Sequence, residues 1–224
     1  MLVFRRRLGR RQIPRMEFFR SVGRTIKSTV VDSGILDHPE YEVDDSKKGD
    51  GYEVRHYPPS MWVSTTEQGM SWQDGPGRKG FFKLFNFIQG KNERSQKIEM
   101  TVPVATRVQP GAGPNCESTF TISFFIPPKN QESAPKPKAE DVFLETWPAM
   151  DIYARTFSGY AKDADYLREA QVLTEKLGGS VDLEQSFYFI VGYNSPWQMF
   201  NRRNEVWFVK KLQETDDTHG ETKE

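Results

Sequence analysis

Two side chains in this sequence are suited to holding a ligand rather than to transforming one: the imidazole of His56 and the guanidinium of Arg78. Imidazole is a common ligand for protein-bound iron, and a guanidinium meets a carboxylate with two parallel hydrogen bonds. Arg78 stands at the start of a predicted helix that also carries Phe81, Phe82 and Phe85. These residue types indicate noncovalent binding of a flat, apolar molecule that bears acidic groups.

The helix that carries these phenylalanines is predicted over Arg78–Gln89 and ends at Gly90. At 100° per residue, one face should pack on a sheet, and it is formed by Phe81, Leu84, Phe85 and Ile88. Phe82 and Phe87 then lie on the flanks, beyond what one core stripe requires. Either the helix is buried more deeply than usual, or Phe82 has no role, or Phe82 and its neighbours wall an apolar cleft.

The two polar candidates also have simpler interpretations. A lone histidine in a strand is more often only hydrogen-bonded, and an arginine at a helix start is often a solvated charge. His56 is nevertheless the histidine best placed for a ligand site, because His38 precedes a proline in a linker and His219 lies in a polar tail.

The sequence contains no recognisable catalytic motif. Gly-x-Ser-x-Gly, His-Glu-x-x-His, a phosphate-binding loop and the Cys-x-x-Cys-His of covalent heme attachment are all missing. We therefore expect a binding protein and not an enzyme.

The amino-acid composition narrows the class of protein further. Lys and Arg together number 31, as do Asp and Glu, so no global field favours nucleic acid. The single cysteine excludes an intrachain disulfide and suits a reducing, cytoplasmic compartment. No apolar run reaches the roughly 18 residues of a transmembrane helix.

The distribution of charge and of apolar residues divides the chain into three regions. Residues 1–50 are predicted to be a basic extension and linker, partly disordered, with one short helix over Met16–Val31; residues 51–212 form the domain; residues 213–224 are an acidic, disordered tail. The first twenty residues carry seven Arg and one acid. This stretch is a mitochondrial targeting sequence, a basic tail or an extension upstream of Met16.

The domain has alternating or β-branched segments that predict strands and a second helix over Asp163–Leu177, which Gly178 and Gly179 close. The predicted strand segments are 52–57, 61–65, 97–108, 118–126, 141–157, with a break at Trp147–Pro148, 187–193 and 205–212.

The order of these elements repeats with an offset of about 90 residues. Tyr57-Pro58 corresponds to Trp147-Pro148, and the first helix corresponds to the second. Two such strand–helix–strand–strand repeats would pair their sheets and leave the helices outside. The predicted fold class is therefore α+β, a distorted antiparallel β-barrel with pseudo-symmetric halves and two flanking helices.

Four separated motifs, in order, resemble the SOUL/heme-binding protein family: Tyr52–Tyr57, Met100–Val104, Gly192–Pro196 and Asn204–Trp207. The resemblance covers residues 52–212 and includes features of two branches of the family. It implies the same barrel and noncovalent binding of heme or another porphyrin.

The resemblance also assigns residues. It places Arg78 opposite the heme propionates and His56 at a position discussed as an iron ligand. Where a second basic residue is expected, this sequence has Gln198. The implied function is that of a heme carrier, buffer or sensor.

The main alternative is an interaction protein that promotes mitochondrial membrane permeability or cell death. One branch of the family carries a helix that resembles ligands of Bcl-2-type proteins, and the matching segment here is Leu167–Asp182, with Leu173 and Leu177. The same leucines would also pack a helix on its own sheet. A third possibility is an effector-binding domain that accepts varied amphipathic molecules.

Overall fold

The computed structural model describes residues 24–26, 36–47, 51–113, 115–179, 182–195 and 198–211. The Arg-rich segment 1–20 and the acidic tail 213–224 lie outside the described residues, as does most of the helix predicted over Met16–Val31. Within that predicted helix, Arg24–Ile26 form a strand instead, paired antiparallel with Glu42–Asp44. The β-branched pair Thr25-Ile26 suits a strand better than a helix.

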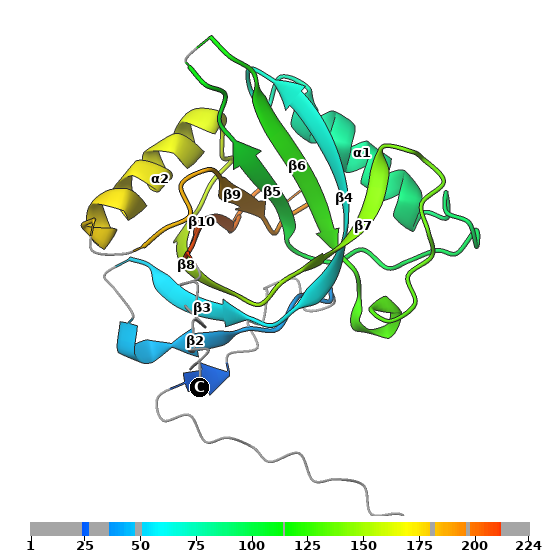
Figure 1. The fold of residues 1–224 in the computed structure, drawn as a ribbon, viewed down its shortest axis with the longest axis horizontal. Coiled ribbons are helices and arrows are strands. Elements are labelled where there is room, and N and C mark those ends of the chain that lie inside the picture. The colour runs from blue at the N-terminus through cyan, green and yellow to red at the C-terminus, as the bar shows by residue number, and fades with distance from the viewer. Residues whose placement is uncertain are drawn as a thin grey trace, which may run out of the picture.

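The described residues form ten strands in one antiparallel sheet and two α-helices (Figure 1). The strands are β1 (Arg24–Ile26), β2 (Glu42–Asp44), β3 (Glu53–Tyr57), β4 (Ser60–Gly69), β5 (Val104–Gln109), β6 (Ser118–Phe125), β7 (Val142–Trp147), β8 (Met150–Phe157), β9 (Tyr188–Gly192) and β10 (Asn204–Val209). The helices are α1 (Pro76–Ile88) and α2 (Asp163–Leu177). The predicted strand over 97–108 is shorter than expected, since only β5 is regular.

The sheet is organised around two bent strands. Tyr57 pairs with Met150, and Ser60 pairs with Trp147, so the register is the same on both sides of the bends. β3–β4 and β7–β8 are therefore one long two-stranded ribbon, bent at the proline-containing junctions 58–59 and 148–149. A proline cannot donate a ladder hydrogen bond, which is why the ribbon is interrupted there.

The strand order confirms the internal duplication. After β1 and β2, the order is β3-β8-β10-β9-β5-β6-β4-β7. Exchanging β3, β4, β5 and β6 with β7, β8, β9 and β10 reverses this order and preserves every neighbouring pair. The two halves are therefore related by a pseudo-twofold axis that passes between β5 and β9.

The sheet curls until its inner face packs against itself. Three strands separate β9 from β7 in the sheet order, yet the ring centroids of Trp147 on β7 and Phe189 on β9 are 5.0 Å apart. Trp147 also stacks on Trp62 at 4.0 Å, and Trp207 lies 6.1 Å from Phe189. This aromatic inner core is why the sheet forms a distorted barrel, as the sequence predicts.

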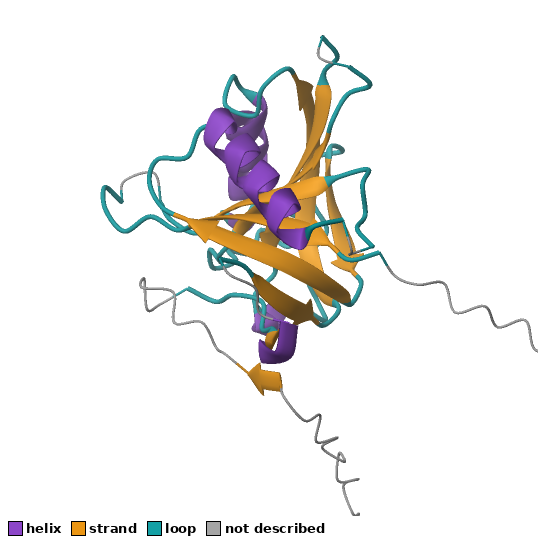
Figure 2. Cartoon of the chain, turned by 90° about the vertical axis from the view of Figure 1, so that its left-hand side faces the viewer, coloured by secondary structure: helices purple, strands orange, loops and turns teal. Residues whose placement is uncertain are grey.

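Both helices pack on the outer face of the curled sheet (Figures 1 and 2). α1 contacts β4 and β6, and α2 contacts the pseudo-equivalent strands β8 and β10. None of the helices in the part of the chain that the structure describes is long and apolar enough to cross a membrane.

The folded unit begins before residue 51. Tyr41 and Val43 are buried in the inner core, and β2 pairs with β3. Residues 36–44 therefore act as a strap over the inner face of the sheet.

Candidate functional site

The orientation of α1 on the sheet decides which of its phenylalanines are exposed. Gly77 and Gly80 are buried, and a Cβ at Gly80 would lie 2.6 Å from the Ile122 side chain. The helix therefore approaches the sheet most closely along its glycine side, and Leu84 and Phe87 are buried on that line. Sequence periodicity wrongly placed Phe87 on a flank, because it gave no weight to residues without side chains.

The other side of α1 carries four of the five residues predicted for ligand binding. The rings of Phe81 and Phe85 stack with centroids 5.9 Å apart, and Phe82 meets Phe81 edge-on at 5.7 Å. Phe82 is 49% exposed. The guanidinium carbon of Arg78 lies 5.8 Å from the centroid of Phe82. The structure thus gathers one apolar surface with a cation at its edge, which we call the α1 wall (Arg78, Phe81, Phe82 and Phe85).

The α1 wall continues onto the outer face of the sheet. Phe81 contacts Phe124 of β6 with centroids 5.2 Å apart, and Phe124 pairs in turn with Val104 of β5. Val104 pairs with Gly192 of β9, and Gly192 pairs with Asn204 of β10. Directly paired residues point to the same face, so these four positions form one row.

This row is partly open. Val104 and Gly192 are only partly buried, and a Cβ added at Gly192 would meet nothing within 4 Å. β6 and β10 are three strand spacings apart, roughly 14 Å. The sheet therefore provides an open floor between the α1 wall and the connection that joins β9 to β10.

That connection forms the opposite rim. Tyr160 donates from its hydroxyl to the Gln198 carbonyl at 3.1 Å and to Met199 Sδ at 3.4 Å. Met199 and Phe200 are 66% and 81% exposed. Exposed large apolar side chains in a group mark a binding surface more often than single ones do. We call Tyr160, Met199 and Phe200 the loop rim.

The loop rim has a cation that sequence analysis missed. The guanidinium carbon of Arg202 lies 4.4 Å from the Tyr160 ring centroid, and Nη1 donates to the Ser195 and Gln198 carbonyls at 2.8 and 2.9 Å. Gln198, where the resemblance implied a basic residue, instead accepts a hydrogen bond from Asn194 and ties the loop together. Arg202 lies two residues before the Asn204–Trp207 motif, and nothing in its local sequence pattern distinguishes it from a solvated charge.

His56 lies elsewhere. It is on β3, which pairs with β2 and β8, whereas α1 packs on β4 and β6 (Figure 1). Its Nδ1 lies 2.8 Å from Asp151 Oδ1, and its side chain is 38% exposed. The structure therefore does not place His56 on the α1 wall, and its role as an iron ligand stays a prediction.

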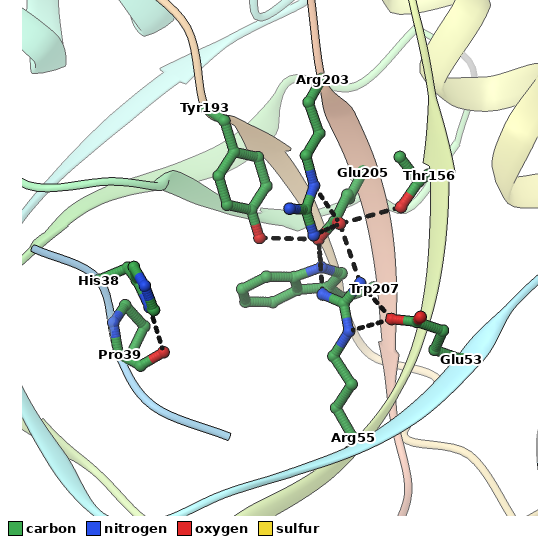
Figure 3. Close-up of polar contacts among 9 residues, drawn as sticks. All are labelled: His38, Pro39, Glu53, Arg55, Thr156, Tyr193, Arg203, Glu205 and Trp207. Carbon is green, nitrogen blue, oxygen red and sulfur yellow. Dashed lines mark hydrogen bonds and ion pairs between the residues drawn. The ribbon is translucent and has the colours of Figure 1, made fainter. Parts of the chain in front are cut away.

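Glu205 is the centre of the polar network inside the barrel (Figure 3). Its carboxylate is fully buried and accepts hydrogen bonds from five side chains: Arg55, Thr156, Tyr193, Arg203 and Trp207. Burial alone would raise the pKa of Glu205, but the charges and hydrogen bonds of Arg55 and Arg203 hold it well below its ordinary value. Burial raises the pKa of Tyr193 well above its ordinary value.

The network has a structural consequence for the loop rim. Arg203 donates to Glu205 through Nε and Nη2, at 2.9 and 2.6 Å, and its backbone N–H donates to Asn194 Oδ1. Asn204 donates to the Gly159 carbonyl at 2.9 Å. The base of the connection is thus fixed to the barrel interior, which positions Arg202 and the exposed residues beside it.

The interior is closed by the strap, residues 36–44. His38 and Pro39 lie beside Tyr193 in Figure 3, and the Tyr41 ring packs against that of Tyr57 in a tilted arrangement with centroids 5.0 Å apart. The cavity between the strap and the sheet is only about 10 Å³. Within the described residues, no group of three or more His, Cys, Asp or Glu side chains is arranged to hold a metal ion.

The comparisons with known proteins agree with this architecture. The family described as "SOUL heme-binding protein" matches residues 36–209. Heme-binding protein 2 of Homo sapiens is 43% identical over 170 residues, which cover 74% of this chain and 81% of that protein. Heme-binding protein 1 of Xenopus laevis is 30% identical over 164 residues, covering 73% and 86%.

Among solved structures, the EcmrR C-terminal domain aligns with a TM-score of 0.50 at 11% identity and covers 72% of this chain and 98% of that one, which shows a shared fold alone. The match to the family over the folded unit, the identity to its members and the duplicated barrel together show that this chain belongs to the SOUL heme-binding protein family.

Proposed function

We propose that this protein binds heme or a related tetrapyrrole noncovalently in the groove between the α1 wall and the loop rim, and that it acts as a carrier, buffer or sensor without turnover. The observation that carries the proposal is the open row of Val104 and Gly192 between two apolar, cation-bearing edges. The names of the relatives, heme-binding proteins 1 and 2, support the ligand class.

The residues present fit a porphyrin. The missing side chain at Gly192 leaves room for a flat ring against the sheet, and Phe82 and Phe200 offer apolar contact on either side. Arg78 and Arg202 stand at the two edges, where guanidinium groups would meet propionates. Bound heme would supply its iron and its strong visible absorption; these residues would supply only binding and orientation.

The exposure of the groove favours a ligand that is bound and released reversibly. Phe82 is about half exposed and Phe200 is mostly exposed, so a ring between them would keep one edge in water. An open site suits a carrier or buffer better than an enzyme, which encloses its reacting group.

Hemin titration of the full chain, followed by its Soret band, tests this function. We expect saturable binding of about one equivalent, weakened roughly tenfold in Phe82→Asp, because a buried charge replaces apolar contact. Phe143→Asp, at an exposed phenylalanine of β7, is the matched control and should leave the affinity unchanged. Binding that does not saturate, or equal losses in both variants, would contradict the groove.

The same titration separates ring contact from axial ligation. His56→Ala should leave affinity and Soret position unchanged if the groove holds the ring. A Soret shift that disappears only in His56→Ala would move the site to β3 and revive the predicted iron ligand.

The alternative, a helix that binds Bcl-2-type proteins, meets an obstacle in the folded chain. Leu173 is fully buried, and Leu177 is 5% exposed. α2 would have to leave the sheet before these leucines could enter a partner's groove, so the native state does not favour this function.

Cytoplasmic localisation, with a mitochondrial alternative from the Arg-rich N-terminus, stays a prediction. Imaging a fluorescent protein fused to residues 1–35 tests it. A mitochondrial targeting sequence should by itself direct the fusion to mitochondria, whereas a diffuse cytoplasmic signal would contradict the mitochondrial alternative.

A further inference from the structure

A second cleft borders the side of α1 that faces away from Phe81 and Phe85. Its volume is about 390 Å³, within the range of small-molecule sites. Lys83, Asn86 and Phe87 of α1 form one wall, and Pro137, Lys138, Ala139 and Val142 form the other. None of the residues of the heme groove lines it.

Both ends of this cleft are held by specific contacts. At one end, Asn92 forms a β-bridge with Pro137, and the Glu93 N–H donates to the Lys136 carbonyl at 2.9 Å. At the other end, Lys83 Nζ lies 2.5 Å from Asp141 Oδ2 and also pairs with Glu67. The two walls are therefore set at a fixed distance, and the cleft is formed before any ligand arrives.

The end of α1 presents few acceptors to this cleft. The last carbonyls of the helix already accept hydrogen bonds from the backbone N–H groups of Gln89, Gly90, Lys91 and Ile98. Asn92, which is fully buried, also donates to the Phe87 carbonyl at 3.0 Å. Satisfied carbonyls reduce the repulsion that a helix C-terminus would exert on an anion.

The lining combines an apolar floor with cations. Phe87 and Val142 are buried at the floor. Lys91 and Lys138 are exposed at the rim, and neither has an ion-pair partner among the described residues; no acid lines the cleft. The Asn86 side-chain amide likewise has no hydrogen-bond partner in the described part of the chain and is available as a donor.

We propose that this cleft binds an amphipathic organic anion, with its apolar body on Phe87 and Val142 and its anionic group between Lys91 and Lys138. The site is separate from the heme groove and does not depend on heme binding. Lys83 takes no direct part, because Glu67 and Asp141 neutralise it.

Fluorescence titration with two probes that share the same aromatic body tests the charge requirement. 8-Anilinonaphthalene-1-sulfonate carries the anion, and N-phenyl-1-naphthylamine lacks it. We expect the sulfonate to saturate at about one equivalent and to bind roughly tenfold more tightly than the neutral probe, as one favourable charge contact predicts.

Variants of the full chain then locate the probe. The pair Lys91→Glu with Lys138→Glu should weaken sulfonate binding roughly tenfold or more. The pair Lys97→Glu with Lys211→Glu changes the net charge equally at exposed lysines outside the cleft and should have little effect. Ala139→Trp, at an exposed position of the cleft wall, should block the probe by filling the space.

The outcomes are decisive in both directions. Equal losses in the two lysine pairs would show a general charge effect and overturn the site. Loss of the sulfonate in Phe82→Asp, with no loss in Ala139→Trp, would place the probe in the heme groove instead. Hemin binding that fails while the probe still binds the cleft would contradict the proposed function alone.

Discussion

Arg55 donates to both carboxylate oxygens of Glu205, at 2.8 and 3.0 Å, across 150 residues of sequence. Both side chains are almost completely buried. The pair joins β3, at the start of the domain, to β10, at its end, although these strands are not neighbours in the sheet. It therefore fixes the curled shape of the barrel and, through Arg203, the base of the loop rim.

Removing the Glu205 carboxylate should destabilise the fold strongly. Glu205→Ala removes the buried carboxylate that Arg55 and Arg203 share and leaves Arg55 only the partly exposed Glu53; removing one partner of a buried ion pair typically costs about 3–5 kcal/mol. Urea denaturation measures the loss in the free energy of unfolding. Glu99→Ala is the control, because its ion pair with Lys129 is exposed and should be worth less than about 1 kcal/mol. Similar small losses in both variants would show that the buried pair is not a strong constraint.

The same carboxylate should make stability depend on pH. Its folded pKa lies below the ordinary value of 4.5, so the folded state binds fewer protons than the unfolded state. The stabilisation is therefore complete above about pH 5 and is lost as the pH falls below 4.5 toward the folded pKa. The melting temperature of wild type should fall more steeply than that of Glu205→Gln between about pH 5 and pH 3. Parallel curves would assign acid sensitivity to other groups.

Arg202 should contribute to hemin affinity although the sequence did not single it out. Arg78→Ala and Arg202→Ala should each weaken binding roughly three- to tenfold, as expected for partly solvated charge-assisted hydrogen bonds. Arg94→Ala removes an exposed arginine that donates to Ser133, away from the groove, and should have no effect. If Arg202→Ala binds hemin as wild type does, the loop rim does not meet the propionates.

Gly80 should be coupled to Ile122. An added Cβ would lie 2.6 Å from Ile122 Cδ1, so Gly80→Ala should lower the free energy of unfolding by about 1 kcal/mol even after its gain in helix propensity. Ile122→Val removes that methyl group and should cost less in the Gly80→Ala background than in wild type. A double-mutant cycle by urea denaturation measures this coupling. Additive changes in the free energy of unfolding would mean that the helix shifts to relieve the contact and that the Ile122 side chain does not move.

Leu173 should behave as a core residue. Leu173→Ala should lower the free energy of unfolding by about 2–5 kcal/mol, since the side chain is fully buried. Leu167→Ala, on the exposed side of α2, should change it by less than about 0.5 kcal/mol. A small loss at Leu173 would indicate that α2 leaves the sheet easily, which the partner-binding alternative requires.

Several features of this protein are determined locally, and the sequence alone predicted them. α2 was predicted over the residues that it occupies, because its apolar period is regular and Gly178 adopts the left-handed conformation that ends it. The bends at Pro58 and Pro148 were predicted because proline removes a ladder hydrogen bond wherever it stands. The duplication followed from the order of such elements.

Only the tertiary structure decided which residues meet. Phe87 and not Phe85 is fully buried, because two glycines let α1 approach the sheet on one side, which periodicity of the apolar residues cannot report. Strand register placed Gly192 beside Val104 and so left a partly open row on the outer face of the sheet. Arg202 lies against Tyr160 because Glu205 anchors its neighbour, Arg203, inside the barrel. A one-residue change of register would turn the Val104 side chain to the opposite face of the sheet, so pairing across long sequence separations, and not local pattern, fixes the open row.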